Sequence, residues 1–204
     1  MTTAAALAVF VVYALAAFGW RSIRQLRRTG STGFRGISGA PLSAEWTGGV
    51  LFVIAMVSFP VAAVLALLDV VAAAPMPAVV VAVGATLCGL GFAATLWSQI
   101  AMGDSWRVGV DKSEQTALVS SGPFNLVRNP IFSAMVVASL GFTILVPSVI
   151  SIVGLVALVV AIELQVRLVE EPYLLRAHGS DYAGYAAAVG RFVPGLGRLS
   201  GRSL

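Results

Sequence analysis

Long apolar stretches separated by short polar segments dominate this chain. A helix needs roughly 20 apolar residues to cross a bilayer core of about 30 Å. The pattern predicts spans at residues 4–20, 46–68, 78–100, 131–146 and 149–162. The second and third are the clearest, whereas the fourth and fifth are short. We therefore expect an all-α, polytopic membrane protein with five transmembrane helices.

The fourth and fifth predicted spans are separated only by Pro147 and Ser148. Proline lacks a backbone donor and disfavours helix at the preceding residue, so a tight turn is expected here. The two spans then form a C-terminal helical hairpin. The fifth helix is expected to continue past Glu163 and to leave the membrane as a polar helical tail.

Basic residues predict the orientation of the spans. All thirteen Lys and Arg residues fall within 21–45, 101–130 and 163–204. Five spans with an external N-terminus place these three segments on the cytoplasmic side, as the positive-inside rule expects. We therefore predict a multi-pass protein of the cell membrane, with its N-terminus outside and its C-terminal tail in the cytoplasm.

The first apolar run has the length of a signal peptide but the opposite charge pattern. No basic residue precedes it, and four arginines follow it, at positions 21, 24, 27 and 28. A signal peptide carries its basic region first, so we expect this run to be a retained helix. The segment 21–45 is rich in Gly, Ser and Arg, which predicts a flexible basic loop.

The composition excludes several classes of function. Only 11% of residues are charged and 58% are hydrophobic, whereas a soluble domain carries about 25% charged residues. The net charge of +4 does not indicate nucleic acid, because the basic residues flank apolar runs and form no patch with interleaved aromatics. One cysteine, Cys88, and one histidine, His178, argue against a disulfide and against a zinc, haem or iron–sulfur site.

Polar residues that could carry chemistry begin just before the fourth span. Gly122-Pro123 indicates a turn in which the backbone can approach a ligand closely, and Pro130 suits the first turn of a helix. Arg128 either extends to the membrane interface or binds a carboxylate through a bidentate pair. Both interpretations remain open from the sequence.

A second group follows the fifth span. Glu163, Arg167 and Glu170 have helical spacing and share one face, and Glu171 follows directly. A solvated helix end with one salt bridge would explain them. A carboxylate near the membrane is costly, however, and by default suggests a functional role.

A third group lies in the tail. Asp181 is a candidate N-cap of a short helix that carries Tyr182 and Tyr185 on one face. Interfacial tyrosines are often only headgroup anchors. Together with Arg191 and the upstream glutamates, they predict a pocket for a small zwitterion.

These groups, in this order, resemble the isoprenylcysteine carboxyl methyltransferase family and its phospholipid-methyltransferase relatives. The resemblance covers roughly residues 120–194. It rests on Gly122-Pro123-Phe124, Arg128-Asn129-Pro130, Glu170-Glu171, Leu174, His178-Gly179, Tyr182, Tyr185 and Arg191-Phe192-Val193-Pro194, with the hairpin between them. The chain departs from the family pattern at Asn129, where the family has His, at Phe124 and Phe132, where it has Tyr, and at His178, where it has Phe.

The resemblance implies a methyl donor, S-adenosylmethionine, bound at the cytoplasmic face. Its expected binding residues are Leu118, Val119, Gly122, Pro123, Phe124, Asn129, Pro130, Glu170, Tyr182 and Tyr185, and its expected catalytic residues are Arg128, Glu171 and Arg191. A glutamate would hold the donor's ammonium group. Arg191 or Arg167 would hold a carboxylate or phosphate of the acceptor.

The resemblance also implies the acceptor and the organisation of the chain. The acceptor would be a lipophilic or prenylated molecule, either an isoprenylcysteine-like carboxylate or a lipid, that arrives laterally from the bilayer. Residues 1–117 would form an N-terminal membrane region and residues 118–204 the catalytic region. No metal ion and no nucleic acid is expected.

Two alternatives remain open. Sterol-reductase-like membrane proteins have a similar C-terminal hairpin and polar tail but use NADPH for hydride transfer. A non-catalytic membrane scaffold would use the same tyrosines and arginines only as anchors. A cofactor comparison would separate the first alternative from methyl transfer, and substitution of Arg128 and Glu171 would test the second.

Overall fold

The computed structural model describes residues 3–33, 36–71, 76–106 and 117–199. Within these ranges the chain is helical and contains no strand, only two isolated bridges, Val127 with Gly190 and Val193 with Leu196. The predicted all-α class is therefore confirmed. Arg35, Arg107, Lys112 and Arg202, four of the basic residues used to predict the orientation, lie outside the described residues.

Four helical stretches are long and apolar enough to cross a membrane, and a fifth apolar helix is shorter. The first stretch, Thr3–Thr29, joins α1 (Thr3–Ala14), the π-helical segment η1 (Leu15–Trp20) and α2 (Arg21–Thr29). The others are α3 (Ala44–Leu67), α4 (Ala78–Met102), α5 (Pro130–Leu145), and α6 (Val149–Leu164) with its continuation. The chain is thus a multi-pass membrane protein built of helices.

The shorter apolar helix is α5, which has 16 residues and is therefore about 24 Å long at about 1.5 Å per residue. Pro130 is its first residue, which confirms the prediction that this proline lies in the first turn of a helix. The turn to α6 is also confirmed, because α5 ends at Leu145 and α6 begins at Val149. Ser148 caps α6: its hydroxyl accepts from the Ser151 amide at 3.1 Å, and its own amide donates to the Ser151 hydroxyl at 3.1 Å.

The prediction of a flexible loop from residue 21 onward is wrong for its first part. The helix continues through α2 to Thr29 and ends at Gly30, which has a φ of 76°. Arg21 is only 2% exposed, and its guanidinium donates to the carbonyl groups of Gln99 and Gly103. It also lies 5.0 Å from the centre of the Trp106 ring. These contacts at the end of α4 hold α2 in place. They cannot be predicted from the composition of α2 itself.

Glycines allow close packing between the long helices. A Cβ at Gly91 would lie 2.4 Å from the backbone nitrogen of Ala138, and one at Gly141 would lie 2.6 Å from that of Cys88. These two sites join α4 to α5. On the other side of the bundle, Gly154 of α6 faces Ser58 of α3, at 2.9 Å from an added Cβ to the Ser58 Cβ. Small residues are the usual means of close helix approach in membranes.

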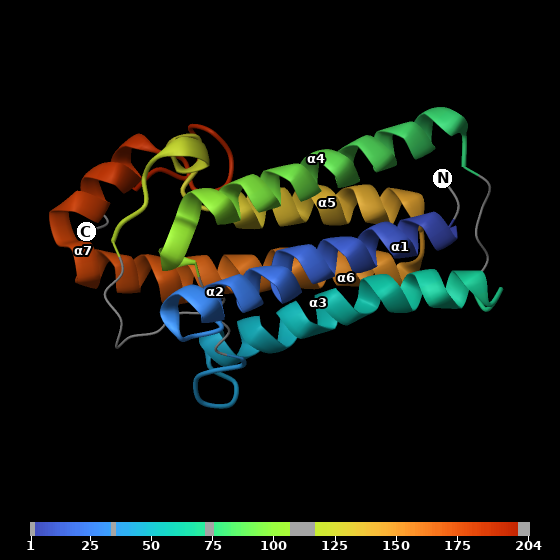
Figure 1. The fold of residues 1–204 in the computed structure, drawn as a ribbon, viewed down its shortest axis with the longest axis horizontal. Coiled ribbons are helices and arrows are strands. Elements are labelled where there is room, and N and C mark those ends of the chain that lie inside the picture. Colours follow the sequence, from blue (N-terminus) through green and yellow to red (C-terminus); the bar gives the residue numbers. More distant parts are fainter. Residues whose placement is uncertain (1–2, 34–35, 72–75, 107–116, 200–204) are drawn as a thin grey trace.

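Figure 1 shows α3 and α4 along opposite edges of the bundle, with α1, α5 and α6 between them. The α5–α6 turn, the end of α3 and the start of α4 lie at the same end of the bundle as the start of α1. At the other end lie α2, the segment before α5, and α7 (Glu171–Ala188) with the C-terminus. The polar segments therefore gather at one end of the bundle.

Candidate functional site

The segment before α5 and the tail after α7 lie directly against each other. The amide of Arg128 donates to the carbonyl of Gly190 at 2.8 Å, and the amide of Asn129 donates to the carbonyl of Arg191 at 3.1 Å. The Asn129 side-chain amide donates to the same Arg191 carbonyl at 3.2 Å. The expectation that the hairpin brings these two segments together is confirmed.

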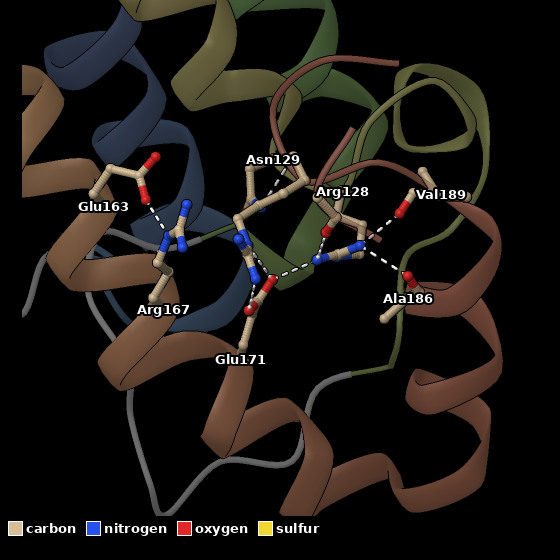
Figure 2. A network of polar contacts seen from close by, with 9 residues as sticks. Arg128, Asn129, Glu163, Arg167, Glu171, Ala186 and Val189 are labelled. Atoms are coloured by element: carbon tan, nitrogen blue, oxygen red, sulfur yellow. Dashed lines mark hydrogen bonds and ion pairs between the residues drawn. The ribbon is translucent and has the colours of Figure 1, made fainter. Parts of the chain in front are cut away.

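A buried ion cluster fastens this junction (Figure 2). Arg128 Nη2 lies 2.6 Å from Glu171 Oε1. Arg191 makes a bidentate pair with the same carboxylate, with Nε at 2.7 Å from Oε1 and Nη2 at 2.8 Å from Oε2. Arg128 and Glu171 are each only 5% exposed. The three predicted catalytic residues therefore lie together and bind one another.

Arg128 also holds the backbone of the tail. Its Nη1 donates to the carbonyl of Ala186 at 3.0 Å and to that of Val189 at 2.5 Å, as Figure 2 shows. Its Nη2 donates to the carbonyl of Gly197 at 3.1 Å. Of the two interpretations of Arg128, extension to the interface does not describe it, because the side chain points into the protein and contacts a carboxylate.

The charge state of Glu171 follows from these neighbours. Burial alone would raise the pKa of its carboxyl group, but hydrogen bonds from Arg191 and Arg128, together with their positive charges, outweigh burial and lower it below 4.5. The same pair raises the pKa of Arg191. The cluster is therefore ionised at neutral pH, with two positive charges around one negative charge.

Between α6 and α7 the chain forms a π-helical segment, η4 (Gln165–Glu170). Glu163 at the end of α6 pairs with Arg167 of η4, and both side chains are exposed, as the solvated interpretation predicts. Glu170 faces another way: its carboxylate accepts from Gln165 Nε2 at 3.4 Å, and both residues line the cavity described below. A π turn accommodates more residues than an α turn, so it changes which side chains face inward.

Gly179 interrupts the helical backbone of α7, with φ 50° and ψ −123°. The break divides α7 into two helical parts, and the second part, after Gly179, corresponds to the predicted short helix that carries Tyr182 and Tyr185. The predicted tyrosine pair is present, with the rings of Tyr182 and Tyr185 6.1 Å apart. The Tyr185 hydroxyl donates to the carbonyl of Phe124 at 2.7 Å.

Both tyrosines stay protonated at neutral pH. Burial raises the pKa of Tyr185 to about 12. Burial, reinforced by the negative charge of Glu171, also raises the pKa of Tyr182. Neither phenol can therefore serve as a base near pH 7, and the single hydroxyl hydrogen of Tyr185 is already donated to Phe124.

A cavity of about 350 Å³ lies between the segment before α5, the polar residues of η4 and α7, and the adjoining ends of the long helices. Nine of the thirteen predicted site residues line it: Leu118, Val119, Phe124, Arg128, Asn129, Pro130, Glu170, Tyr182 and Tyr185. The other four, Gly122, Pro123, Glu171 and Arg191, are not among the lining residues, and neither is Arg167. Glu171 instead binds the lining residue Arg128, and Arg191 binds Glu171.

The cavity has a polar and an apolar part. Carboxylate, amide, phenol and imidazole groups come from residues 128–129, η4 and α7, including His178. Apolar side chains come from α3, α5 and α6, namely Phe52, Val53, Ile131, Phe132, Met135, Ala161 and Ile162. The site can therefore hold a polar molecule and a hydrocarbon side by side.

Sequence reasoning missed the wall that the N-terminal half contributes. It consists of Phe18, Gly36, Ile37, Ser38, Glu45, Gly48, Gly49, Gln99, Met102, Ser105 and Trp106, besides the α3 residues above. Two signals were present: Glu45 is an acid at the start of an apolar run, and Gln99 is an amide inside one. Tyr173, His178 and Gln165 were also missed as lining residues. Among the described residues no group of three or more His, Cys, Asp or Glu side chains is placed to hold a metal ion.

Comparison with known proteins identifies the family. The family model described as "Phospholipid methyltransferase" matches residues 79–181, half of the chain. The match runs from α4 through the hairpin into α7 and so includes much of the cavity wall. No curated protein and no solved structure matches the chain. The chain belongs to the phospholipid methyltransferase family, a family of membrane methyltransferases.

Proposed function

We propose that the protein transfers a methyl group from S-adenosylmethionine to a lipophilic acceptor at the cytoplasmic face of the cell membrane. One observation carries the proposal: a single cavity is polar where the segment before α5 meets the tail and apolar where it extends between α3, α5 and α6. Family membership favours methyl transfer over hydride transfer from NADPH and over a scaffold without activity.

The cavity suits the donor in size and in chemistry. Its volume of about 350 Å³ lies within the range of small-molecule sites, roughly 300–1,000 Å³. Among the described residues, Arg128 Nε and Gln99 Oε1 are buried without a hydrogen-bond partner, and both residues line the cavity. Buried polar atoms of this kind are usually satisfied by a ligand or water.

We assign a role to each polar lining residue from its charge and its hydrogen-bonding groups. Glu170 would pair with the ammonium group of the donor, and Asn129 with Arg128 would bind its carboxylate. Tyr182 and Tyr185 would cover it with their rings, and the Tyr182 hydroxyl would donate a hydrogen bond, since that of Tyr185 is donated to Phe124. When bound, S-adenosylmethionine supplies an electrophilic methyl group on a sulfonium. We propose that Glu171 and Arg191 act as positioning residues, because they fix Arg128 and the tail.

The apolar lining would hold the acceptor next to the methyl group. Methyl transfer is an in-line displacement that depends on alignment and on exclusion of water. The residues from α3, α5 and α6 would supply both, since they surround the acceptor with hydrocarbon. A carboxylate acceptor, such as an isoprenylcysteine-like one, is already a nucleophile and needs no base. We propose carboxyl O-methylation for this reason, with a lipid headgroup as the other acceptor.

Binding and turnover test the proposal. Purified protein in lipid nanodiscs should release heat on titration with S-adenosylhomocysteine. It should also transfer a radiolabelled methyl group from S-adenosylmethionine to a membrane lipid extract. A base-labile product would identify a carboxyl ester. Wild-type protein that neither binds S-adenosylhomocysteine nor labels any lipid would refute the proposal.

Glu170→Gln tests the proposed ammonium contact, with Glu163→Gln as a matched control. A hydrogen bond to a charged group contributes about 1.5–3 kcal/mol, so Glu170→Gln should weaken S-adenosylhomocysteine binding roughly 10- to 100-fold. Glu163 is exposed and does not line the cavity, so Glu163→Gln should leave the Kd within about twofold. Equal Kd values for the two variants would remove Glu170 from the donor site.

A further inference from the structure

The outer face of α2 carries arginines next to a large aromatic side chain. Trp20, Arg24 and Arg27 follow one another at spacings of four and three residues, so their side chains lie on one face of the helix. Arg21 is turned inward and is 2% exposed. The nine residues of α2 include four arginines and no acidic residue. The helix itself therefore supplies no negative charge to balance this Trp20–Arg24–Arg27 face.

Arg24 and Arg27 have the chemistry of a phosphate site. The guanidinium carbon of Arg24 lies 5.5 Å from the centre of the Trp20 ring. Stacking on an indole occupies the flat side of a guanidinium and leaves the N–H groups at its edge for another partner. Arg27, three residues further on, is exposed. Because a guanidinium matches two oxygens of a phosphate at once, two arginines on one face suit a phosphate group.

The depth of this face along the first span matches that of the lipid phosphates. The helical stretch Thr3–Thr29 is continuous. At about 1.5 Å per residue, Trp20 lies about 26 Å, Arg24 about 32 Å and Arg27 about 36 Å from Thr3. A hydrocarbon core of about 30 Å therefore ends between Trp20 and Arg24. Both arginines then lie in the headgroup layer, with the indole at its inner boundary, where tryptophan is enriched.

Apolar side chains flank the same face. Ile23 is 54% exposed and Leu26 is 47% exposed, and Ile23 lies one helical turn before Arg27. A nucleic acid or an acidic protein would meet the arginines but would leave these side chains against charged groups. A phospholipid offers a phosphate to the arginines and hydrocarbon to the apolar side chains. The composition of the face therefore favours a membrane lipid as its partner.

We propose that the Trp20–Arg24–Arg27 face binds an anionic membrane phospholipid, with the phosphate held by the two arginines and an acyl chain packed against Trp20, Ile23 and Leu26. A headgroup without an amine, such as that of phosphatidylglycerol, is favoured, because an ammonium group would lie among arginines and meet no acidic residue of α2. No residue of α2 lines the cavity, so this site is separate from the donor and acceptor sites and does not depend on the proposed function.

Quenching of tryptophan fluorescence tests the site. Nanodiscs of phosphatidylcholine would contain a small fraction of either phosphatidylglycerol or phosphatidylcholine that carries bromine atoms on one acyl chain close to the headgroup. The difference between wild type and Trp20→Phe isolates the signal of Trp20 from that of the other tryptophans. The affinity for phosphatidylglycerol relative to phosphatidylcholine should be about 10- to 30-fold in the wild type. It should fall close to one when Arg24→Gln and Arg27→Gln are combined.

Arg176→Gln combined with Arg198→Gln is the matched control. Both residues are exposed, and they lie in α7 and in the tail that folds back on it. Figure 1 shows α7 at the same end of the bundle as α2. The control pair therefore removes the same net charge from the same end and should keep the wild-type lipid preference. Arg24→Lys with Arg27→Lys keeps the charge at the site and should retain most of the preference.

Thermal unfolding provides a second readout. A lipid that binds the folded protein raises its melting temperature, so phosphatidylglycerol added to detergent micelles should stabilise the wild type and the control pair but not the Arg24→Gln, Arg27→Gln pair. Without added lipid all three proteins should melt at similar temperatures, because the substituted side chains make surface contacts.

Three results would overturn the proposal. The first is equal quenching of Trp20 by the two brominated lipids in the wild type. The second is an equal loss of preference in the two glutamine pairs, which would show attraction by net charge alone. The third is full competition by inorganic phosphate, which would assign Arg24 and Arg27 to a soluble anion. No measurement includes S-adenosylmethionine, so failure of methyl transfer would leave the lipid site untouched.

Discussion

Glu171 is the residue on which the polar contacts at the loop–tail junction converge. Its carboxylate receives hydrogen bonds from Arg128 and from Arg191. Removing one partner of a buried ion pair leaves the other charges uncompensated, which is far more costly than losing a surface pair. Here two arginines depend on one glutamate, so the junction is sensitive to this single side chain.

Glu171→Gln should destabilise the protein by about 3–5 kcal/mol. It would leave the guanidinium groups of Arg128 and Arg191 without their shared counter-charge. Thermal unfolding in detergent should show a markedly lower melting temperature at pH 7. Glu163→Gln breaks only an exposed pair, so it should change the free energy of unfolding by less than about 1 kcal/mol. Similar melting temperatures for the two variants would contradict a structural role for the cluster.

The pH dependence of stability should report the same group. The pKa of Glu171 is lower in the folded protein than its ordinary 4.5. Its contribution is therefore fully present above pH 4.5 and is lost as the pH falls through the folded pKa. The wild-type melting temperature should drop in this acidic window, and the drop should be smaller in Glu171→Gln. An equal drop in both proteins would assign it to other carboxyl groups.

At the scale of the helices, α4 and α5 depend on glycine where their backbones meet. A Cβ at Gly91 would collide with Ala138, at 2.4 Å from its backbone nitrogen. On the same helix, a Cβ at Gly89 would meet nothing within 4 Å. The two glycines therefore differ in neighbours although they share a helix and a residue type.

Gly91→Ala should destabilise the bundle by about 1–3 kcal/mol, the usual cost of overpacking a core. Gly89→Ala should be neutral or slightly stabilising, because alanine is the better helix former. Cys88 is a free, buried cysteine, so a thiol-reactive dye that becomes fluorescent on unfolding can measure both variants. Equal melting curves would show that α4 and α5 are not in close contact at Gly91.

The helices also show which features the sequence could predict. Apolar runs, Pro130 and the Pro147-Ser148 turn are local signals, and the structure confirms each of them. The extension of the first helix through Arg21 is not local, because it depends on carbonyl groups at the end of α4. The same holds for the N-terminal wall of the cavity, whose residues carry no motif and are recognised only from their neighbours.

At the scale of the whole molecule, the helical hairpin brings the predicted binding residues together. The sequence identified two polar segments and a hairpin between them, which was enough to predict that the segments meet. It did not predict that Arg128 and Arg191 would both pair with Glu171, because a list of charged residues does not say which of them pair. Side-chain pairing is decided by tertiary distance, which spacing along the chain does not determine.

The predicted orientation can be tested with single cysteines. Val70 is exposed and follows the end of α3 at Leu67, whereas Ser180 is exposed in α7. Figure 1 shows α7 at the opposite end of the bundle from this end of α3. The native Cys88 is buried and should remain unlabelled. On intact cells, a membrane-impermeant maleimide should label Val70→Cys but not Ser180→Cys, and disruption of the cells should expose Ser180→Cys. The reverse pattern would invert the topology predicted from the basic residues.

The π-helical segment η4 has a consequence for how the chain tolerates change. A helical residue corresponds to a rotation of about 100° at 3.6 residues per turn. The single π turn Gln165–Glu170 holds one residue more than an α-helical turn, so deleting one residue there would restore an ordinary α-helix without rotating the helix beyond it. The carboxylate of Glu171 would then still reach both of its arginines, whereas the same deletion within α6 would turn it away from them by that angle. The chain therefore tolerates the loss of one residue in this short stretch but not in the helix before it.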